Sequence, residues 1–157
     1  MSIKDVKPTN NSGYNQGYYN PLYPKKYAGK PPIIYRSSWE LKFMKMCDNR
    51  EDIVKWASEP VEIKYWSSID KKEHKYFPDF YIKVKKKDGY EESLIEIKPS
   101  SHLKKPAPPT KNSKQALKNY KFLAEQFVKN RDKYRYAKEW AQSRGFRFVV
   151  MTEKSLK

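Results

Sequence analysis

Two short segments joined by a turn constrain the fold of this chain more than any other feature of its sequence. Residues 76–82 and 94–98 are rich in the aromatic and β-branched residues that strands favour. Asp88-Gly89 lies between them, and this dipeptide is a strong signal for a two-residue hairpin turn. The sequence therefore predicts a β-hairpin at the centre of the fold.

A turn made of those two residues sets the register of the hairpin, with Asp79 opposite Lys98 and Tyr81 opposite Glu96. Because strand side chains alternate, Asp79, Glu96 and Lys98 share one face. Asp79 and Glu96 are then diagonal neighbours roughly 7 to 8 Å apart, a separation that one divalent cation can bridge. The alternative is an ordinary charge set on a solvated face. The opposite face is apolar and carries Phe80, Ile82, Val84, Ile95 and Ile97.

The segment before the hairpin predicts one helix and a further strand. Ser37, with Glu40 three residues later, forms a capping box, and the helix should end near residues 48–50. Glu40 lies beside the apolar stripe of this helix, so it can serve as a cap and also direct a carboxylate at the sheet. Residues 61–66 alternate as a strand, whereas His74 is expected in a loop.

Helices and a last strand are predicted after the hairpin. Ser113 should cap one helix, and a second helical stretch ends at Gly145. The apolar residues expected to face inward on the first of these are Leu117, Tyr120, Phe122, Leu123 and Phe127. Residues 146–151 form the final strand, which can pair parallel with a central strand because a long helical crossover precedes it. We expect a mixed α/β sheet flanked by helices.

Composition divides the chain into an arm and one domain. Residues 1–32 are basic, rich in tyrosine and poor in aliphatic residues, which predicts an extended arm that contacts nucleic acid or protein, or else a solvated tail. Residues 33–157 are long enough for one domain. Within it, prolines and lysines at 99–112 predict a mobile loop. Cys47 is the only cysteine, which excludes a cysteine-rich zinc site, and we expect it in the core.

A net charge of +16 favours a polyanionic partner, with nucleic acid the first candidate and an anionic membrane surface the competitor. The candidate DNA-binding residues are Arg36, Lys114, Lys118 and Lys121. The three lysines recur as a helical stripe suited to phosphate contacts, or else form a solvated face. No apolar run approaches a membrane span and no secretory signal is visible, so we expect a soluble protein that is not secreted.

Glu40, Asp79, Glu96 and Lys98 suggest phosphodiester hydrolysis. Mg²⁺ prefers a few carboxylates, waters and substrate phosphate, and this set supplies the carboxylates, although Mn²⁺ is an alternative. Lys98 would orient or deprotonate the attacking water, or neutralise the developing charge.

The same residues resemble a known nuclease family. Pro78-Asp79 followed by Glu96-Ile97-Lys98 is similar to the PD-(D/E)XK motif, and Glu40 is similar to the extra glutamate of several of its branches. The surrounding sequence, over roughly residues 18–157, resembles the head-completion nucleases of large tailed bacteriophages, relatives of TnsA-type transposon endonucleases. The segments that carry this resemblance are Tyr35–Glu40, Trp56–Pro60, Tyr76–Phe80, Glu96–Pro99, Gly145-Phe146 and Met151–Glu153.

The resemblance implies a restriction-endonuclease-like αβββαβ core. By analogy, Glu40, Asp79 and Glu96 are metal ligands together with the carbonyl of Ile97, and Lys98 is the catalytic lysine. It also implies an endonuclease that acts on double-stranded DNA during phage head completion, next to portal or neck proteins, in the virion or the host cytoplasm. A homodimer is one way to cut the second strand.

Two other functions compete with this one. A structural head-completion protein can use the same fold and charge to hold DNA ends or the portal and neck region without cutting. An RNA-binding module is less favoured, because the aromatic residues mostly lie at core spacing.

Overall fold

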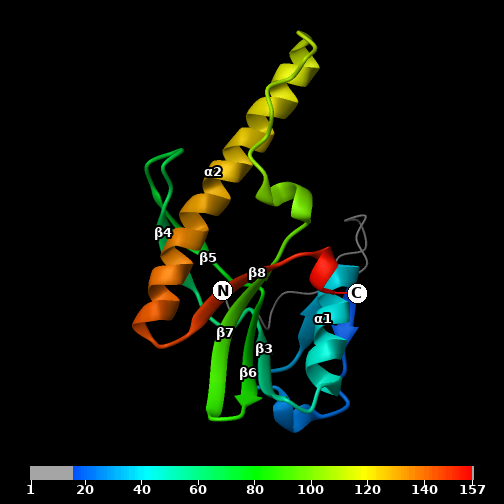
Figure 1. Cartoon of the computed structure of the whole chain (residues 1–157). Helices are drawn as coiled ribbons and strands as arrows, with labels where there is room; N and C mark the ends of the chain where they lie inside the picture. Colours follow the sequence, from blue (N-terminus) through cyan, green and yellow to red (C-terminus); the bar gives the residue numbers. More distant parts are fainter. Residues whose placement is uncertain (1–15, 157) are drawn as a thin grey trace.

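The computed structural model describes residues 16–156 (Figure 1). Its elements, in chain order, are β1 (Gly17–Tyr19), η2 (Pro24–Lys26), β2 (Ile33–Tyr35), α1 (Ser38–Asn49), β3 (Ile53–Ser58), β4 (Ile63–Trp66), β5 (Glu73–Tyr76), β6 (Phe80–Lys86), β7 (Gly89–Ile97), η3 (Ser100–Leu103), α2 (Lys114–Ser143), β8 (Arg147–Met151) and η4 (Glu153–Ser155). No helix within residues 16–156 is both long enough and apolar enough to cross a membrane.

A four-stranded sheet in the order β3-β6-β7-β8 forms the centre of the molecule. Strands β3, β6 and β7 are antiparallel neighbours, whereas β8 pairs parallel to β7. The predicted mixed sheet, with its last strand parallel to a central one, is therefore confirmed. The predicted hairpin is also present, as β6 and β7.

The register of this hairpin differs from the prediction by two residues. Lys86 pairs with Gly89 and Tyr81 pairs with Leu94, so the turn residues are Lys87 and Asp88. Gly89 still provides the unusual backbone, with a φ of +137°, but it does so as the first residue of β7. Because a shift of two preserves the faces, the acids stay together.

The strand partners before the hairpin also differ from the prediction. The neighbour of β6 is β3, a strand that the sequence did not predict. The predicted strand at 61–66 contains β4, but β4 pairs with β5 in a separate two-stranded ribbon. His74 lies in β5 rather than in a loop.

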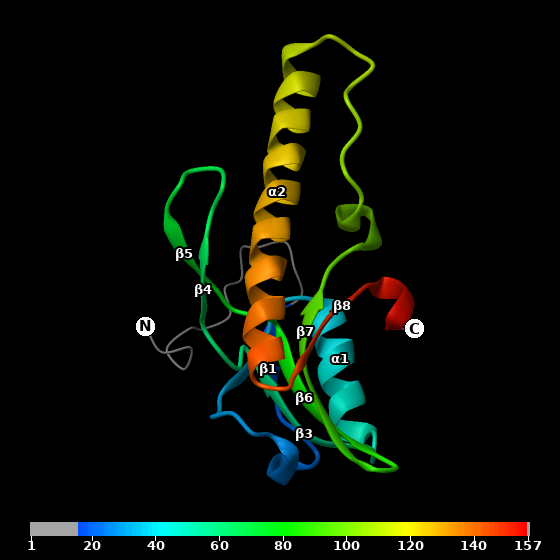
Figure 2. The same cartoon turned by 60° about the vertical axis from the view of Figure 1, so that its left-hand side comes forward.

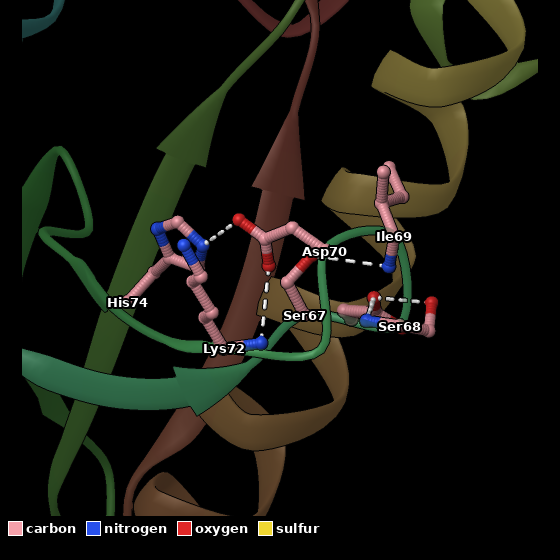
Figure 3. Close-up of polar contacts among 7 residues, drawn as sticks. Ser67, Ser68, Ile69, Asp70, Lys72 and His74 are labelled. Carbon is pink, nitrogen blue, oxygen red and sulfur yellow. Dashed lines mark hydrogen bonds and ion pairs between the residues drawn. The ribbon is translucent and has the colours of Figure 1, made fainter.

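The ribbon of β4 and β5 is fixed against α2 by polar contacts at its tip (Figure 3). Both the amide and the hydroxyl of Ser68 donate to Asp132 of α2, at 2.8 and 2.7 Å. Asp70 accepts from the amide of Lys72 at 3.1 Å and contacts His74 Nε2 at 2.6 Å. These bonds define the turn and place the ribbon beside α2, as Figure 2 shows.

The helices α1 and α2 cover opposite faces of the sheet (Figures 1 and 2). The face under α1 is the predicted apolar face, and it packs with Phe43, Met44 and Cys47 of that helix. Cys47 is fully buried, as expected of a core residue. The other face has a smaller core in which Leu94 and Tyr81 pack with Ala137 and neighbouring aromatic side chains.

Helix α2 is one continuous 30-residue helix rather than the two predicted stretches. Ser113 caps it as predicted, since its hydroxyl accepts from the amide of Ala116 at 3.1 Å. The first half of the helix projects beyond the sheet (Figure 2). Three of its predicted inward-facing residues are consequently exposed, and they are Leu117, Phe122 and Leu123.

The described part of the predicted arm, residues 16–32, packs onto the domain. Strand β1 pairs with β2, and the buried carboxylate of Asp48 accepts from the hydroxyl of Tyr19 at 2.7 Å. The same carboxylate accepts from the amides of Leu22 and Tyr23 at 2.6 and 3.0 Å. The packing therefore shows no break at residue 32, while residues 1–15 lie outside the described part.

The segment at 99–112 begins with η3, where the amide of Ser100 donates to Glu153 at 2.9 Å and its hydroxyl donates at 2.5 Å. Beyond η3 it has no regular structure until the cap of α2. Its mobility stays a prediction.

Candidate active site

Two carboxylates meet where β6 begins and β7 ends. Asp79 directly precedes β6, and its Oδ2 accepts a hydrogen bond from the amide of Ile97 at 2.8 Å. Glu96 lies near the end of β7 with 5% of its surface exposed. Phe80 pairs with Ile95, so the next position along the hairpin places Asp79 opposite Glu96. The two acids are therefore closer to each other than the diagonal neighbours that the sequence predicted.

Glu96 is held on both sides by neighbouring side chains. The hydroxyl of Tyr76 donates to Oε2 at 2.6 Å, inside the protein. Lys98 Nζ lies 3.6 Å from Oε1, and the amide of Lys98 donates to the carbonyl of Met151 at 2.9 Å. The parallel pairing of β7 with β8 thus fixes the backbone at the lysine that follows Glu96.

Burial and mutual repulsion give the two acids unusual electrostatics. Burial raises the pKa of Asp79 well above its usual value, and the neighbouring Glu96 raises it further. Burial also raises the pKa of Glu96, although Tyr76 and Lys98 oppose that change. A bound cation would relieve this repulsion, so the two carboxylates suit a divalent ion that takes its other ligands from water and substrate.

Glu40 lies in the first turn of α1, where its amide donates to the capping hydroxyl of Ser37 at 3.1 Å. Its carboxylate accepts from the amide of Arg36 at 3.2 Å, so the capping role is present. Burial raises its pKa, and its charge contributes to the raised pKa of Asp79. Yet no three Asp, Glu, His or Cys side chains among residues 16–156 are grouped closely enough to hold a metal by themselves.

Sequence reasoning missed two residues of α2 that face the acids. Lys133 Nζ lies 5.4 Å from the ring centre of Tyr76. Burial lowers the pKa of Lys133, and the positive charges of Lys129 and Lys98 lower it further. The hydroxyl of Tyr134 is buried without a hydrogen-bond partner among residues 16–156. Burial raises the pKa of Tyr134, and the charges of the two acids add to this. Lys129 and Lys133 continue the helical spacing of the stripe that begins with Lys114, Lys118 and Lys121. That spacing could have indicated from the sequence that Lys133 belongs to the same face of the helix.

The predicted DNA-binding residues do not gather at one place. Arg36 lines a cavity together with Phe77, which lies two residues before Asp79. Lys114, Lys118 and Lys121 belong to the half of α2 that projects from the sheet (Figure 2).

Residues 50–153 match the family model for the TnsA-like endonuclease N-terminal domain. This range contains Asp79, Glu96 and Lys98 and leaves Glu40 outside. The chain is also 32% identical over 142 residues to the head completion nuclease of Enterobacteria phage T4. The aligned residues are 90% of this chain and 93% of that protein. The similarity therefore extends over nearly the whole chain rather than over a short motif.

Proposed function

Because this chain belongs to the TnsA-like endonuclease family, we propose that it is a nuclease of phage head completion that hydrolyses phosphodiester bonds of DNA with a divalent cation. The observation that carries the proposal is the pair of acids at one end of the hairpin, the partly buried Asp79 and the buried Glu96, with Lys98 Nζ 3.6 Å from Glu96. A structural protein would have no need of two neighbouring carboxylates, one of them buried, that repel each other.

The proposed architecture is the PD-(D/E)XK core. In chain order, α1, β3, β6, β7, α2 and β8 provide the pattern helix, three strands, helix and strand. The ribbon of β4 and β5 is then an insertion between the first and second of these strands. In this assignment Asp79 directly precedes the second of the three strands and Glu96 lies on the third, which supports the proposed site.

In this proposal Asp79 and Glu96 hold the cation, with the carbonyl of Ile97 and the carboxylate of Glu40 as the further predicted ligands. When bound, a Mg²⁺ or Mn²⁺ ion supplies Lewis acidity that stabilises charge on the phosphate. Lys98 orients the attacking water or neutralises the developing charge. Lys133 contacts a non-bridging phosphate oxygen from the side of α2.

The test is a nicking assay on supercoiled and linear DNA with Mg²⁺, with Mn²⁺ and with a chelator. Suitable variants are Glu96→Gln, which keeps an acceptor for Tyr76, and Lys98→Ala, with the exposed Lys85→Ala as the matched control. We expect cleavage that requires metal, is lost in the first two variants and is retained in the control. Cleavage in the chelator, or cleavage by Lys98→Ala at the wild-type rate, would contradict the assignment.

A structural role is the second candidate, and the projecting half of α2 favours it. This half combines exposed Leu117, Phe122 and Leu123 with the lysine stripe, which suits a portal or neck protein that has apolar and acidic surface. Tight DNA binding with no cleavage under any metal condition would support this function. In either case we propose that the protein acts in the virion or in the host cytoplasm during assembly.

A further inference from the structure

A cavity of about 750 Å³ reaches the segment that carries Asp79, because Phe77, two residues before that acid, lines it, as does Glu59, whose amide donates to the carbonyl of Asp79. The nuclease function alone does not explain this cavity. It is bordered by the end of β3, the face of β6 and β7 that carries Tyr81 and Leu94, and the C-terminal end of α2. Its volume falls within the range of small-molecule sites, roughly 300 to 1,000 Å³.

Aromatic side chains form much of the cavity wall. The rings of Tyr81 and Phe146 lie 5.8 Å apart, and Trp140 meets Phe146 edge-on at 5.8 Å. Phe77 also lines the cavity, and it is 38% exposed although it lies only two residues before Asp79. A large exposed aromatic residue beside an active site is a suitable platform for a planar ligand.

Three carboxylates provide hydrogen-bond acceptors in the cavity wall. Glu59, Glu62 and Glu92 line the cavity, and Glu92 is oriented by a hydrogen bond from the hydroxyl of Tyr81. Glu59 has a φ of +44°, in the region that side chains disfavour, and its amide donates to the carbonyl of Asp79 at 2.8 Å. A hydrogen bond therefore connects the strained backbone of Glu59 directly to Asp79.

The aromatic rings and the carboxylates of the cavity wall together suit the base of a nucleotide. Carboxylates repel phosphate but accept hydrogen bonds from the exocyclic amino groups of cytosine, adenine and guanine. The aromatic rings suit stacking on any base. Lys30 and Arg36, which also line the cavity, can neutralise the phosphate attached to such a base.

We propose that the cavity binds one unpaired nucleotide of the DNA substrate, with an amino-bearing base stacked on Phe77. This inference rests on the proposed nuclease function, since it places the base next to the segment that carries Asp79, one of the acids proposed to cut the strand. A base within a duplex is paired and stacked, so it cannot enter unless it leaves the helix. The preferred substrate is therefore DNA with a single-stranded tail or a distorted end, cut next to the duplex.

The test compares binding of a blunt duplex with binding of the same duplex carrying a short dC tail, in chelator so that no cleavage occurs. Stacking of one base contributes about 1 to 3 kcal/mol, which corresponds to roughly a 5- to 150-fold preference of the wild type for the tailed DNA. Phe77→Ala should remove this preference and leave blunt-duplex affinity unchanged. Phe77→Leu, which keeps apolar bulk without a ring, should also lose most of it. A dT tail, which lacks an amino group, should bind more weakly than dC.

Phe122→Ala is the matched control, because Phe122 is 61% exposed on α2 and does not line the cavity. A 2-aminopurine in the tail gives a second readout, since its fluorescence should be quenched by the wild type and by Phe122→Ala and not by Phe77→Ala. Equal affinity of the wild type for tailed and blunt DNA, or an equal loss for both in Phe77→Ala, would overturn the proposal.

The nicking assay separates the two hypotheses. Metal-dependent cleavage without any preference for tailed DNA would refute the nucleotide cavity and leave the nuclease intact. A preference that depends on Phe77, in a protein that cleaves nothing, would retain the cavity and refute the nuclease.

Discussion

The hydroxyl of Tyr76 stabilises the buried carboxylate of Glu96 through a hydrogen bond of 2.6 Å. Tyr76→Phe removes this donor and leaves a buried acceptor unsatisfied. We expect the free energy of unfolding to fall by about 1 to 3 kcal/mol, measured as a shift of the urea midpoint. Tyr90→Phe is the control, because Tyr90 is exposed and its variant should stay within about 0.5 kcal/mol of wild type. A similar loss in both variants would show that the bond to Glu96 contributes nothing specific.

Asp79 should be dispensable for folding and required for cleavage. Asp79→Asn keeps an oxygen that can accept from the amide of Ile97 and removes a partly buried charge that Glu96 repels. We expect a melting temperature equal to or above that of wild type and cleavage at least roughly 100-fold slower. DNA affinity should hold or increase, because the variant has one negative charge fewer near the phosphate. Loss of the native circular dichroism spectrum would assign Asp79 a structural role instead.

Among single residues, the sequence correctly predicted the proximity of those that belong to one short motif. Asp79, Glu96 and Lys98 share a face because strand alternation is local, and the two-residue error in register preserved that face. Tyr76 and Tyr134 could not be found in this way. Their positions depend on how a long helix and a ribbon pack against the hairpin, and no local pattern encodes such packing.

At the level of elements, the two halves of α2 should respond differently to substitution. Leu117→Ser and Leu123→Ser lie in the projecting half, with 49% and 47% of each leucine exposed, and should change stability by less than about 0.5 kcal/mol. Ala137→Leu lies in the half that packs on the sheet, where Ala137 is fully buried, and overpacking should cost roughly 1 to 3 kcal/mol. Chemical unfolding of all three variants measures the difference. A large loss in the leucine variants would mean that the projecting half is packed in solution.

The sequence predicted elements better than it predicted their partners. The caps at Ser37 and Ser113 were confirmed because capping depends on neighbouring residues. Strand β3 was missed because its apolar and polar residues do not alternate. Strand β4 was assigned to the main sheet because its partner β5, which contains His74, was expected to be a loop. Helix α2 was divided in two because its polar middle has no apolar period, although the helix continues through it.

At the scale of the whole molecule, the net charge of +16 makes DNA affinity strongly dependent on salt. If Lys114, Lys118 and Lys121 bind phosphates, their joint replacement by alanine should reduce the slope of log affinity against log salt by roughly 0.9 for each phosphate that is no longer neutralised. Fluorescence anisotropy at several salt concentrations measures the slope. The control is replacement of Lys85, Lys86 and Lys87, around the β6–β7 turn at the other end of the molecule. An unchanged slope in the α2 variant would assign its lysines to a solvated face or to a protein partner.

The projecting helix also fixes a length. Lys114 is the first residue of α2, and Lys133 lies near the acids. Because an α-helix rises 1.5 Å per residue, the two lysines are about 28 Å apart along the helix. At 3.4 Å per base pair this corresponds to about eight base pairs of B-form DNA. DNA held at the tip of α2 and cut at its base would therefore be trimmed at a constant offset from the point of attachment. The length of α2 would then set the distance between the attachment point and the cut. Lengthening the helix by whole turns would lengthen the DNA between these two points.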